Sequence, residues 1–231
     1  MVHSEDIAFH VIAHIHNDYT GKFGIPRQSC LVPEASSSIV FVPAYRNPDA
    51  LRGLEEFSHI WLLWEFSENL RDKWSATVRP PRLGGNVQKG VFATRSPFRP
   101  NPLGLSLVKL EKIVWETAQG PILWVTGGDL MDGTPLFDIK PYLPHTEAVP
   151  DAQGGFATKF NDYALQVECP PELLAQVPQD KQKVLLKVLA QDPRPGYVQD
   201  ADRIYGLSFA EFNVRFQVQG NKVLVREIAH K

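Results

Sequence analysis

Features of several common protein classes are missing from this sequence of 231 residues. It has only two cysteines, Cys30 and Cys169, which stand far apart and outside any CxxC pair. This argues against a disulfide framework and a structural zinc site, so we expect two reduced thiols. The longest apolar run, 60–66, is shorter than the roughly 18–20 residues of a membrane span and contains Glu65. No basic and apolar leader opens the chain. We therefore expect a soluble, cytoplasmic protein.

Motifs of nucleotide-binding folds and of hydrolases are also missing. The sequence has no GxGxxG after a strand, no GxxxxGK[ST] and no GxSxG. It therefore supports no Rossmann site, no P-loop and no nucleophile elbow. His10, His14 and His16 share one face of a candidate strand, but no nearby carboxylate or cysteine completes a set of metal ligands. We expect a solvated histidine face and no metal.

Short apolar segments between turn residues predict a mainly β fold. The candidate strands are 7–15, 38–42, 60–64, 90–94, 103–110 and 122–125, with Pro- and Gly-rich connections between them. The continuous run 60–64 is typical of a strand covered on both sides, and its Trp61 and Trp64 are interpreted as core residues. A short helix is expected at 51–57. Strands and helices do not alternate regularly, which favours a barrel or a sandwich over a doubly wound sheet.

A change of composition after Pro150 predicts a second domain. Residues 151–155 have the composition of a linker, so we place the first domain at 1–150 and a small α+β domain at 156–231. In the second domain a helix can start at Pro170-Pro171, and 181–190 has the period of an amphipathic helix. Gly220-Asn221 is the expected turn of a final hairpin.

One segment carries only positive charges, although the formal net charge of the chain is −2. Between Lys73 and Leu110 there is no Asp or Glu. The basic residues of this segment are Lys73, Arg79, Arg82, Lys89, Arg95, Arg99 and Lys109. A phosphate-rich partner is the physical match for such a local positive surface. A solvated basic face would have the same composition, so charge alone leaves both interpretations open.

Residues 90–104, the 90–104 loop, are the most constrained part of this basic segment. Three prolines within the loop fix their own φ angles and bias the preceding residues to extended geometry. The loop can therefore hold Arg95, Arg99 and Asn101 in place with little loss of entropy on binding. A proline-rich turn that merely connects two strands is the alternative.

Two further segments carry polar groups next to turn residues. Residues 132–142 combine Asp-Gly and Thr-Pro turn pairs with two carboxylates, a lysine and a tyrosine. The carboxylates could accept bonds from ribose hydroxyls or face a sulfonium cation; a turn followed by an edge strand is the alternative. Residues 23–28 join a Gly-Ile-Pro bend to Arg27 and Gln28, a weak signal by itself.

Taken in order, four motifs resemble the TsaA-like tRNA methyltransferases, known in bacteria as the TrmO family. The motifs are 24–28, 79–86, 90–106 and 132–144. Segments 190–195, 202–206 and 212–216 resemble the extra C-terminal domain of the bacterial enzymes, so the resemblance covers most of the chain. It implies a β-barrel-like domain that binds S-adenosylmethionine without a Rossmann fold. It also implies a homodimer that methylates N6 of N6-threonylcarbamoyladenosine at position 37, beside the anticodon of a threonine tRNA.

The resemblance also implies site residues. The cofactor-binding residues carried over by motif are Pro26, Arg27, Gln28, Ser67, Glu68, Arg95, Leu105, Asp132, Gly133, Thr134 and Pro135. Ser67-Glu68 departs from the His-Gln of other members. The expected tRNA contacts are Arg82, Arg99, Asn101, Arg194 and Tyr197. Asp138, close to the expected cofactor loop, is the candidate base that removes the N6 proton.

Two other functions stay open from the sequence. One is a tRNA- or RNA-binding module without catalysis, which the departure at Ser67-Glu68 allows. The other is an S-adenosylmethionine enzyme with a different substrate. A purely structural β-protein would explain neither the arginines nor the rigid loops.

Overall fold

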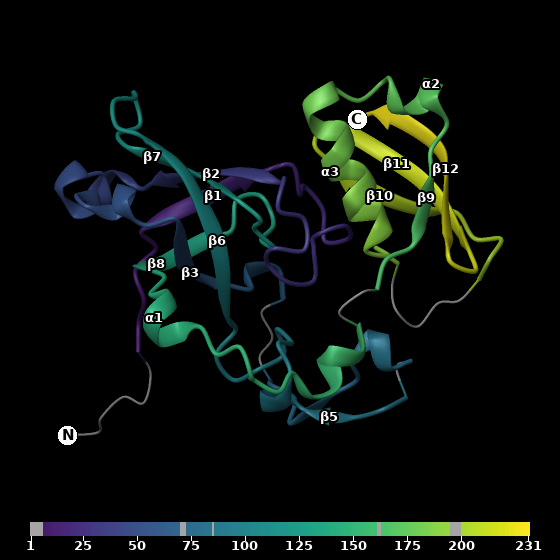
Figure 1. Ribbon diagram of the computed structural model, residues 1–231, viewed down its shortest axis with the longest axis horizontal. Helices are drawn as coiled ribbons and strands as arrows, with labels where there is room; N and C mark the ends of the chain where they lie inside the picture. Colours follow the sequence, from purple (N-terminus) through teal and green to yellow (C-terminus); the bar gives the residue numbers. More distant parts are fainter. Residues whose placement is uncertain (1–6, 70–72, 85, 161–162, 195–199) are drawn as a thin grey trace.

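The computed structural model describes residues 7–69, 73–84, 86–160, 163–194 and 200–231 (Figure 1). The fold is mainly β, with a closed barrel followed by a small α+β domain. The barrel strands are β1 (Ala13–Asn17), β2 (Ser36–Phe41), β3 (His59–Glu65), β6 (Leu103–Val114), β7 (Ile122–Thr126) and β8 (Pro135–Pro141). They close in the order β1-β2-β7-β6-β3-β8, and every neighbouring pair is antiparallel. The expected mainly β, non-Rossmann fold is confirmed.

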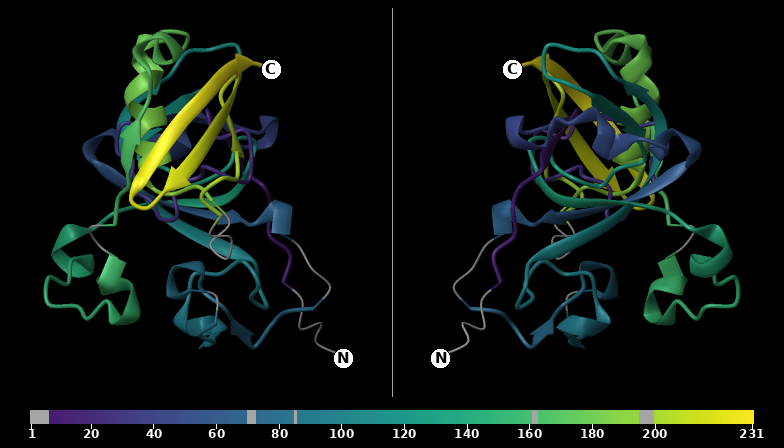
Figure 2. Two further views of the ribbon diagram at one scale, coloured as in Figure 1. Left: turned by 90° about the vertical axis from the view of Figure 1, so that its right-hand side faces the viewer. Right: turned by 90° about the vertical axis from the view of Figure 1, so that its left-hand side faces the viewer.

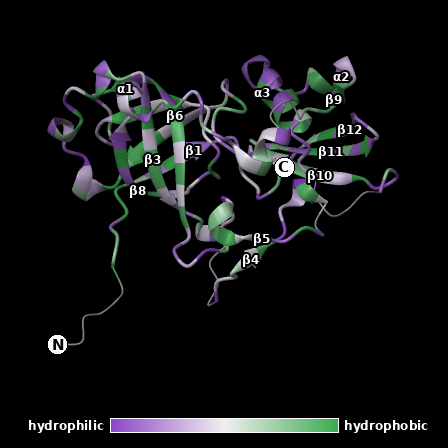
Figure 3. Cartoon of the chain, turned by 60° about the horizontal axis from the view of Figure 1, so that its bottom comes forward, coloured by the Kyte–Doolittle hydropathy of each residue, from purple (hydrophilic) through white to green (hydrophobic). Residues whose placement is uncertain are grey.

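Alternating burial along the strands creates the barrel core. In β3 the residues Ile60, Leu62 and Trp64 point inward and are buried, whereas Trp61 and Leu63 on the outer face are only half-buried. The expectation that this strand is covered on both sides is therefore wrong. A barrel strand needs only one apolar face, because its other face meets solvent or loops. Figure 3 shows the resulting hydrophobic bands on the strands.

Three expected elements differ from the structure. The first strand starts at Ala13, and Ile7 and Phe9 before it are exposed. The expected strand 90–94 is a two-residue strand followed by a 3-10 turn, because a basic, proline-rich loop starts there. The expected helix 51–57 consists of 3-10 turns separated by Gly53, which has a φ of 84°.

Several short elements lie outside the six barrel strands. A small hairpin joins β4 (Thr77–Val78) to β5 (Lys89–Gly90), and α1 (Pro144–Glu147) follows β8. The 3-10 turns are Pro43–Tyr45, Pro48–Leu51, Leu54–Glu56, Ser67–Asn69, Pro81–Leu83, Val91–Ala93 and Gly155–Phe160. Figure 2 shows the β4–β5 region and the segment after β8 as two lobes on the same side of the molecule.

The second domain is a four-stranded sheet covered by a helix. Its strands are β9 (Gln166–Glu168), β10 (Tyr205–Phe209), β11 (Phe212–Gln219) and β12 (Lys222–His230), in the order β10-β11-β12-β9. Its helices are α2 (Pro171–Leu174) and α3 (Gln179–Ala190). The expected amphipathic helix and final hairpin are confirmed, and α3 buries Val184, Leu185, Val188 and Leu189. The exact division at 150–156 stays a prediction.

The connection between β1 and β2 belongs to the core of the second domain. Tyr19, Val32 and Ala35, which follow and precede barrel strands, are buried in the same cluster as the residues of α3 and β10–β12. This segment, 18–35, lies between the barrel and the second sheet in Figure 1. Gly24 fits tightly there, because a Cβ at this position would lie 2.0 Å from Leu207. The second domain therefore fixes a loop of the first.

Candidate functional site

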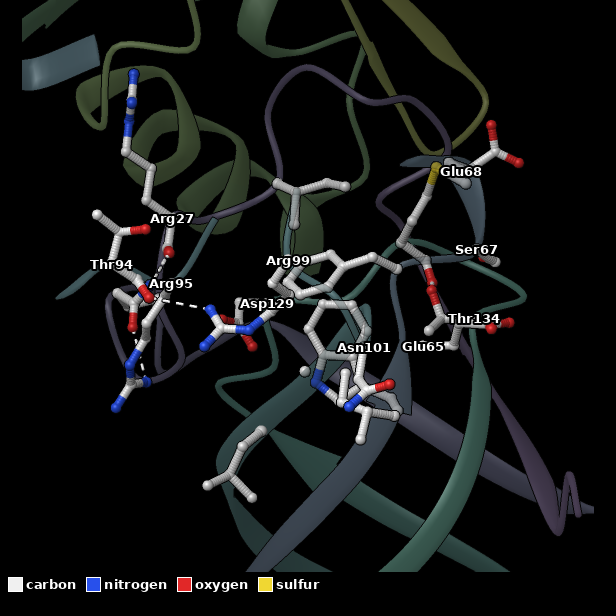
Figure 4. A pocket seen from close by; sticks show the side chains of 18 of the residues that line it. Arg27, Glu65, Ser67, Glu68, Thr94, Arg95, Arg99, Asn101, Asp129 and Thr134 are labelled. Atoms are coloured by element: carbon white, nitrogen blue, oxygen red, sulfur yellow. Dashed lines mark hydrogen bonds between the residues drawn. The ribbon is translucent and has the colours of Figure 1, made fainter. Parts of the chain in front are cut away.

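A cavity of about 690 Å³ opens at the end of the barrel that faces the second domain (Figure 4). Four segments line it: 25–28 from the 18–35 segment, the end of β3 with the turn after it, the 90–104 loop with the start of β6, and 129–134 before β8. Figure 4 shows Arg27 and Arg95 on one side, Ser67 and Glu68 on the other, and Asp129 between them. The volume suits a ligand of cofactor size.

The 90–104 loop is held by its own hydrogen bonds as well as by its prolines. Thr94 donates its hydroxyl to the carbonyl of Val91 at 2.8 Å and accepts the backbone N–H of Ser96 at 3.3 Å. Arg99 donates to the carbonyl of Thr94 at 3.0 Å, as Figure 4 shows. The loop is thus rigid in the structure, as its prolines predict, and part of the Arg99 guanidinium maintains the shape of the loop.

A chain of hydrogen bonds along one side of the cavity joins this loop to the second domain. Arg95 donates to the side-chain oxygen of Gln28 at 2.8 Å, and Gln28 donates to the carbonyl of Arg27. Arg27 in turn donates to the carbonyl of Asp192, after α3, at 3.4 Å. Three residues expected at the cofactor site are therefore linked, although Arg95 is 67 residues away from Gln28 in the sequence.

The turn before β8 forms another wall. Thr134 is buried, lines the cavity and donates its hydroxyl to the carbonyl of Met131 at 2.7 Å. Asp132 points to β1, where it accepts the backbone N–H of Asn17 at 3.1 Å and lies 3.3 Å from the ring of His16. Gly133 has a φ of 78°, a backbone conformation that costs free energy for any residue with a side chain. Asp132 and Gly133 thus build the turn that presents Thr134.

A half-buried carboxylate, Asp129, also lines the cavity. Ser106 donates its hydroxyl to Asp129, and the indole N–H of Trp64 donates to Ser106 at 2.9 Å. The backbone N–H of Ser29 supplies a further bond to Asp129. Burial raises the pKa of Asp129 above its ordinary value, while these bonds and the positive charge of Arg95 act in the opposite direction.

The packing of the Trp64 indole against β6 requires a glycine at position 104. Gly104 is buried in β6, beside Trp64 in β3, and the two residues are cross-strand partners. A Cβ on Gly104 would lie 2.1 Å from Cε2 of the Trp64 indole. The indole therefore lies flat over a glycine, and this position directs its N–H toward Ser106.

The cavity brings together most of the residues expected from the sequence. Those that line it are Pro26, Arg27, Gln28, Ser67, Glu68, Arg95, Arg99, Asn101, Leu105 and Thr134. Asp132, Gly133 and Pro135 adjoin Thr134 in the chain without lining the cavity themselves. Their roles stay predictions, and Tyr197 lies outside the described residues.

Two of the expected tRNA contacts have partners inside the protein. Arg194 binds the carboxylate of Asp192 through two hydrogen bonds of 2.7 and 2.9 Å, and its side chain is only 15% exposed. Arg82 stacks 4.8 Å over the ring of Tyr163, whose hydroxyl donates to Asp192 at 2.8 Å. These residues join the β4–β5 region to the end of α3. A role in tRNA contact for either arginine remains a prediction.

Asp138 lies away from this cavity. It lines a different hollow of about 680 Å³ on the barrel, beside Ile139 and Pro141. Its carboxylate accepts the backbone N–H of Ile139 at 2.9 Å and pairs with Lys140 at 2.9 Å. A β-bulge explains this: in β8, Leu136 is directed into the barrel core, and the register shifts between Leu136, the partner of Trp64, and Asp138, the partner of Leu63. The structure therefore does not bring the expected base to the expected cofactor loop.

Sequence reasoning missed several lining residues. Asp129 carries no recognisable motif beyond the two glycines before it, and its partner Ser106, which does not line the cavity itself, is a small polar residue in β6. Trp64 was expected in the core, which is correct, yet one side of it lines the cavity. Their one shared signal is a polar group at a position that the strand pattern predicts to be inward, because buried polar groups need partners.

The described residues contain no group of three or more His, Cys, Asp or Glu side chains arranged to hold a metal ion. Among the same residues, no helix has the length and apolar character needed to cross a membrane.

The fold and the cavity define a class: an antiparallel β-barrel that binds a small molecule next to a rigid basic loop, with a second domain that completes the binding loop. The family models for the tRNA-methyltransferase O N-terminal domain and the TrmO C-terminal domain match residues 14–148 and 162–231. The chain belongs to the TrmO family, and the resemblance carried by the four motifs is confirmed.

Individual relatives agree with this assignment. The chain is 44% identical over 218 residues to the tRNA (adenine(37)-N6)-methyltransferase of Escherichia coli strain K12, covering 91% of this chain and 92% of that protein. A protein of the same name from Eikenella corrodens is 47% identical over 173 residues, or 74% of this chain and 97% of that one. A crystal structure of TrmO from P. aeruginosa superposes with a TM-score of 0.79 at 32% identity and covers both chains completely.

Proposed function

We propose that this protein is an S-adenosylmethionine-dependent tRNA methyltransferase that methylates N6 of the adenosine at position 37. The finer proposal is that the target is N6-threonylcarbamoyladenosine in a threonine tRNA. The observation that carries the proposal is the cavity itself, which residues 25–28 and Thr134 share with the basic 90–104 loop. One cavity can thus hold a cofactor and an anionic nucleotide side by side, as a transfer between them requires.

The lining of the cavity fits S-adenosylmethionine chemically. This molecule has a cationic sulfonium and ammonium, a carboxylate, a ribose and an adenine. Glu65 and Glu68 supply negative charge, Arg95 supplies positive charge, and Leu105 offers apolar surface. When bound, the sulfonium makes its methyl group electrophilic, so the protein mainly has to align the methyl group with the attacking nitrogen.

Ser67 and Glu68 support catalytic competence despite their departure from the family pattern. Lys22 donates to the backbone carbonyl of Glu68 at 3.0 Å and pairs with its carboxylate at 3.3 Å. The turn is thereby anchored to the 18–35 segment and leaves the cavity open. This argues against the binding module without catalysis, because a blocked or collapsed site would be expected there.

An exposed aromatic pair beside the cavity supports an RNA substrate. Trp74 and Phe92 stack with ring centroids 6.3 Å apart, and 52% and 72% of these residues are exposed. Phe92 also lines the cavity, and basic side chains of the 90–104 loop lie close in the chain. Proteins recognise single-stranded RNA by stacking splayed bases on aromatic rings next to cationic groups.

A homodimer and a cytoplasmic location belong to the proposal through the family. The test of the function is mass spectrometry of tRNA nucleosides after incubation with S-adenosylmethionine. Threonine tRNA with and without the threonylcarbamoyl group would be compared. We expect a gain of one methyl group on the modified nucleoside alone. Methylation of both tRNAs would refute the finer substrate, and methylation of neither, with normal cofactor binding, would refute the function.

A further inference from the structure

Methyl transfer to N6 leaves a proton to be removed. The N6 lone pair forms the new bond to the methyl carbon, and the electron pair of the carbon–sulfur bond stays on sulfur as a neutral thioether. N6 must then lose its hydrogen as a proton to become neutral again. A carbonyl group on N6 withdraws electrons and makes this nitrogen a weak nucleophile, so a base that takes the proton during attack would accelerate the reaction.

Three carboxylates line the cavity, Glu65, Glu68 and Asp129, and they differ in environment. Glu68 is half exposed and already paired with Lys22. Asp129 is half-buried, lies after β7, and is hydrogen-bonded to Ser106 in β6 and to Ser29 in the 18–35 segment. It is therefore the carboxylate whose position is best defined by its surroundings.

The hydrogen bonds of Asp129 have a fixed direction. An indole N–H can only donate, so Trp64 occupies the Ser106 oxygen as an acceptor. The single hydroxyl hydrogen of Ser106 is then directed to Asp129. With the backbone N–H groups of Ser29 and of Asp129 itself, this gives the carboxylate three donors and no acceptor among these partners. The three bonds favour the ionised form and orient the carboxylate.

We propose that Asp129 is a catalytic residue that accepts the N6 proton of the target adenosine as the methyl group is transferred, and then releases this proton to solvent. The inference rests on the proposed function. It replaces Asp138 in this role, because Asp138 lines a different hollow. Burial raises the pKa of Asp129, which makes its carboxylate a stronger base than an exposed one.

The test compares Asp129→Asn with the wild type in three measurements. The first is the single-turnover rate of methyl transfer at saturating cofactor and tRNA across a range of pH. The second is the pair of dissociation constants for S-adenosylmethionine and S-adenosylhomocysteine, measured by calorimetry. The third is thermal unfolding, which checks the fold. Asn keeps the size of Asp and an oxygen that can accept from Ser106. Asp151→Asn, at an exposed site outside the cavity, is the matched control.

We expect Asp129→Asn to lower the saturated rate by about 100-fold or more, the usual contribution of a general base. Both dissociation constants should stay at the wild-type values. The wild-type rate should fall at low pH as the carboxylate is protonated, and this dependence should disappear in the variant. Asp129→Glu, which restores an ionisable group, should recover part of the rate and the dependence on pH.

Other outcomes would overturn the inference. A weaker affinity for S-adenosylmethionine alone would mean that Asp129 acts on the sulfonium charge. Weaker affinity for both ligands, with the saturated rate intact, would mean that it only holds Ser29 and the neighbouring cofactor loop. A full rate in Asp129→Asn with a loss in Glu65→Gln or Asp138→Asn would assign the base elsewhere. A wild type that binds the cofactor and methylates no tRNA would refute the proposed function instead.

Discussion

Replacing Gly104 by alanine tests the packing that positions the cavity wall. The new Cβ would lie 2.1 to 2.5 Å from three ring atoms of Trp64, whereas ordinary contacts begin near 3.4 Å. Trp64 is only 6% exposed, so the rigid indole has to move within a packed core. Its hydrogen bond to Ser106 would then lengthen or break.

The cost of this substitution follows from two effects. Overpacking a core costs about 1–3 kcal/mol, and a buried donor without its acceptor costs about 1–3 kcal/mol more. Together these give roughly 2–6 kcal/mol. For a chain of this size each kcal/mol lowers Tm by about 2–4 °C, so Tm should fall by about 5–20 °C. Because Trp64 lines the cavity, the affinity for S-adenosylmethionine should fall as well.

Gly206→Ala is the matched control for this experiment. Gly206 also lies within a strand, β10, but a Cβ there would meet no atom within 4 Å. Its Tm should stay close to that of the wild type, because open surface sites tolerate substitution within about 0.5 kcal/mol. Differential scanning calorimetry measures both variants. If Gly104→Ala had the same Tm as Gly206→Ala, the argument from close packing would be refuted.

Two further predictions concern RNA binding and acid stability. Phe92→Ala should weaken tRNA binding by about 1–3 kcal/mol, the value of a stacked base; tRNA binding equal to that of the wild type in a filter assay would contradict the stacking role. The carboxylate of Glu34 accepts a hydrogen bond from Lys187 at 2.5 Å and forms an ion pair with Lys183 at 2.9 Å. The bond to Lys187, and to a lesser extent the one to Lys183, lowers the pKa of Glu34 from 4.5 to about 2. Because the folded pKa is the lower one, these contacts stabilise the fold above pH 4.5 and lose this effect as the pH falls toward 2. Glu34→Gln should therefore unfold at lower urea than the wild type at neutral pH, with a difference that shrinks across that window; a constant difference would exclude the mechanism.

Local patterns predicted those parts of the fold that depend on neighbouring residues. The short apolar segments of β2 and β3, the apolar stripe of α3 and the Gly220 turn are all visible within about ten residues of sequence, although the exposed face of β3 is not. The packing of Tyr19 and Val32 into the second core was not predicted, because it depends on contacts with residues far along the chain. The first strand was predicted too long for a related reason. Ile7 continues its alternation, yet Ile7 and Phe9 remain exposed in the structure.

The site was predicted where residues stand in a constrained loop or a motif. Arg95, Arg99 and Thr134 were selected in this way, and the structure brings them to one cavity. Asp138 was selected because it is near Thr134 in the sequence, but the bulge between Leu136 and Asp138 changes the face to which the later residues of β8 point, and no local pattern shows that bulge. Asp129 is recognisable only through its contacts with Ser106 and the barrel, which no local pattern contains.

The packing of the 18–35 segment into the second domain has a consequence for synthesis of the chain. Gly24 leaves the ribosome more than 180 residues before Leu207, against which it packs. At a synthesis rate of about 5–20 residues per second, on the order of 10–40 s pass between the synthesis of Gly24 and that of Leu207. The barrel strands can pair during this delay, because all of them precede residue 142. A nascent chain would therefore have a folded barrel before it has a binding site, and only a finished protein would engage tRNA.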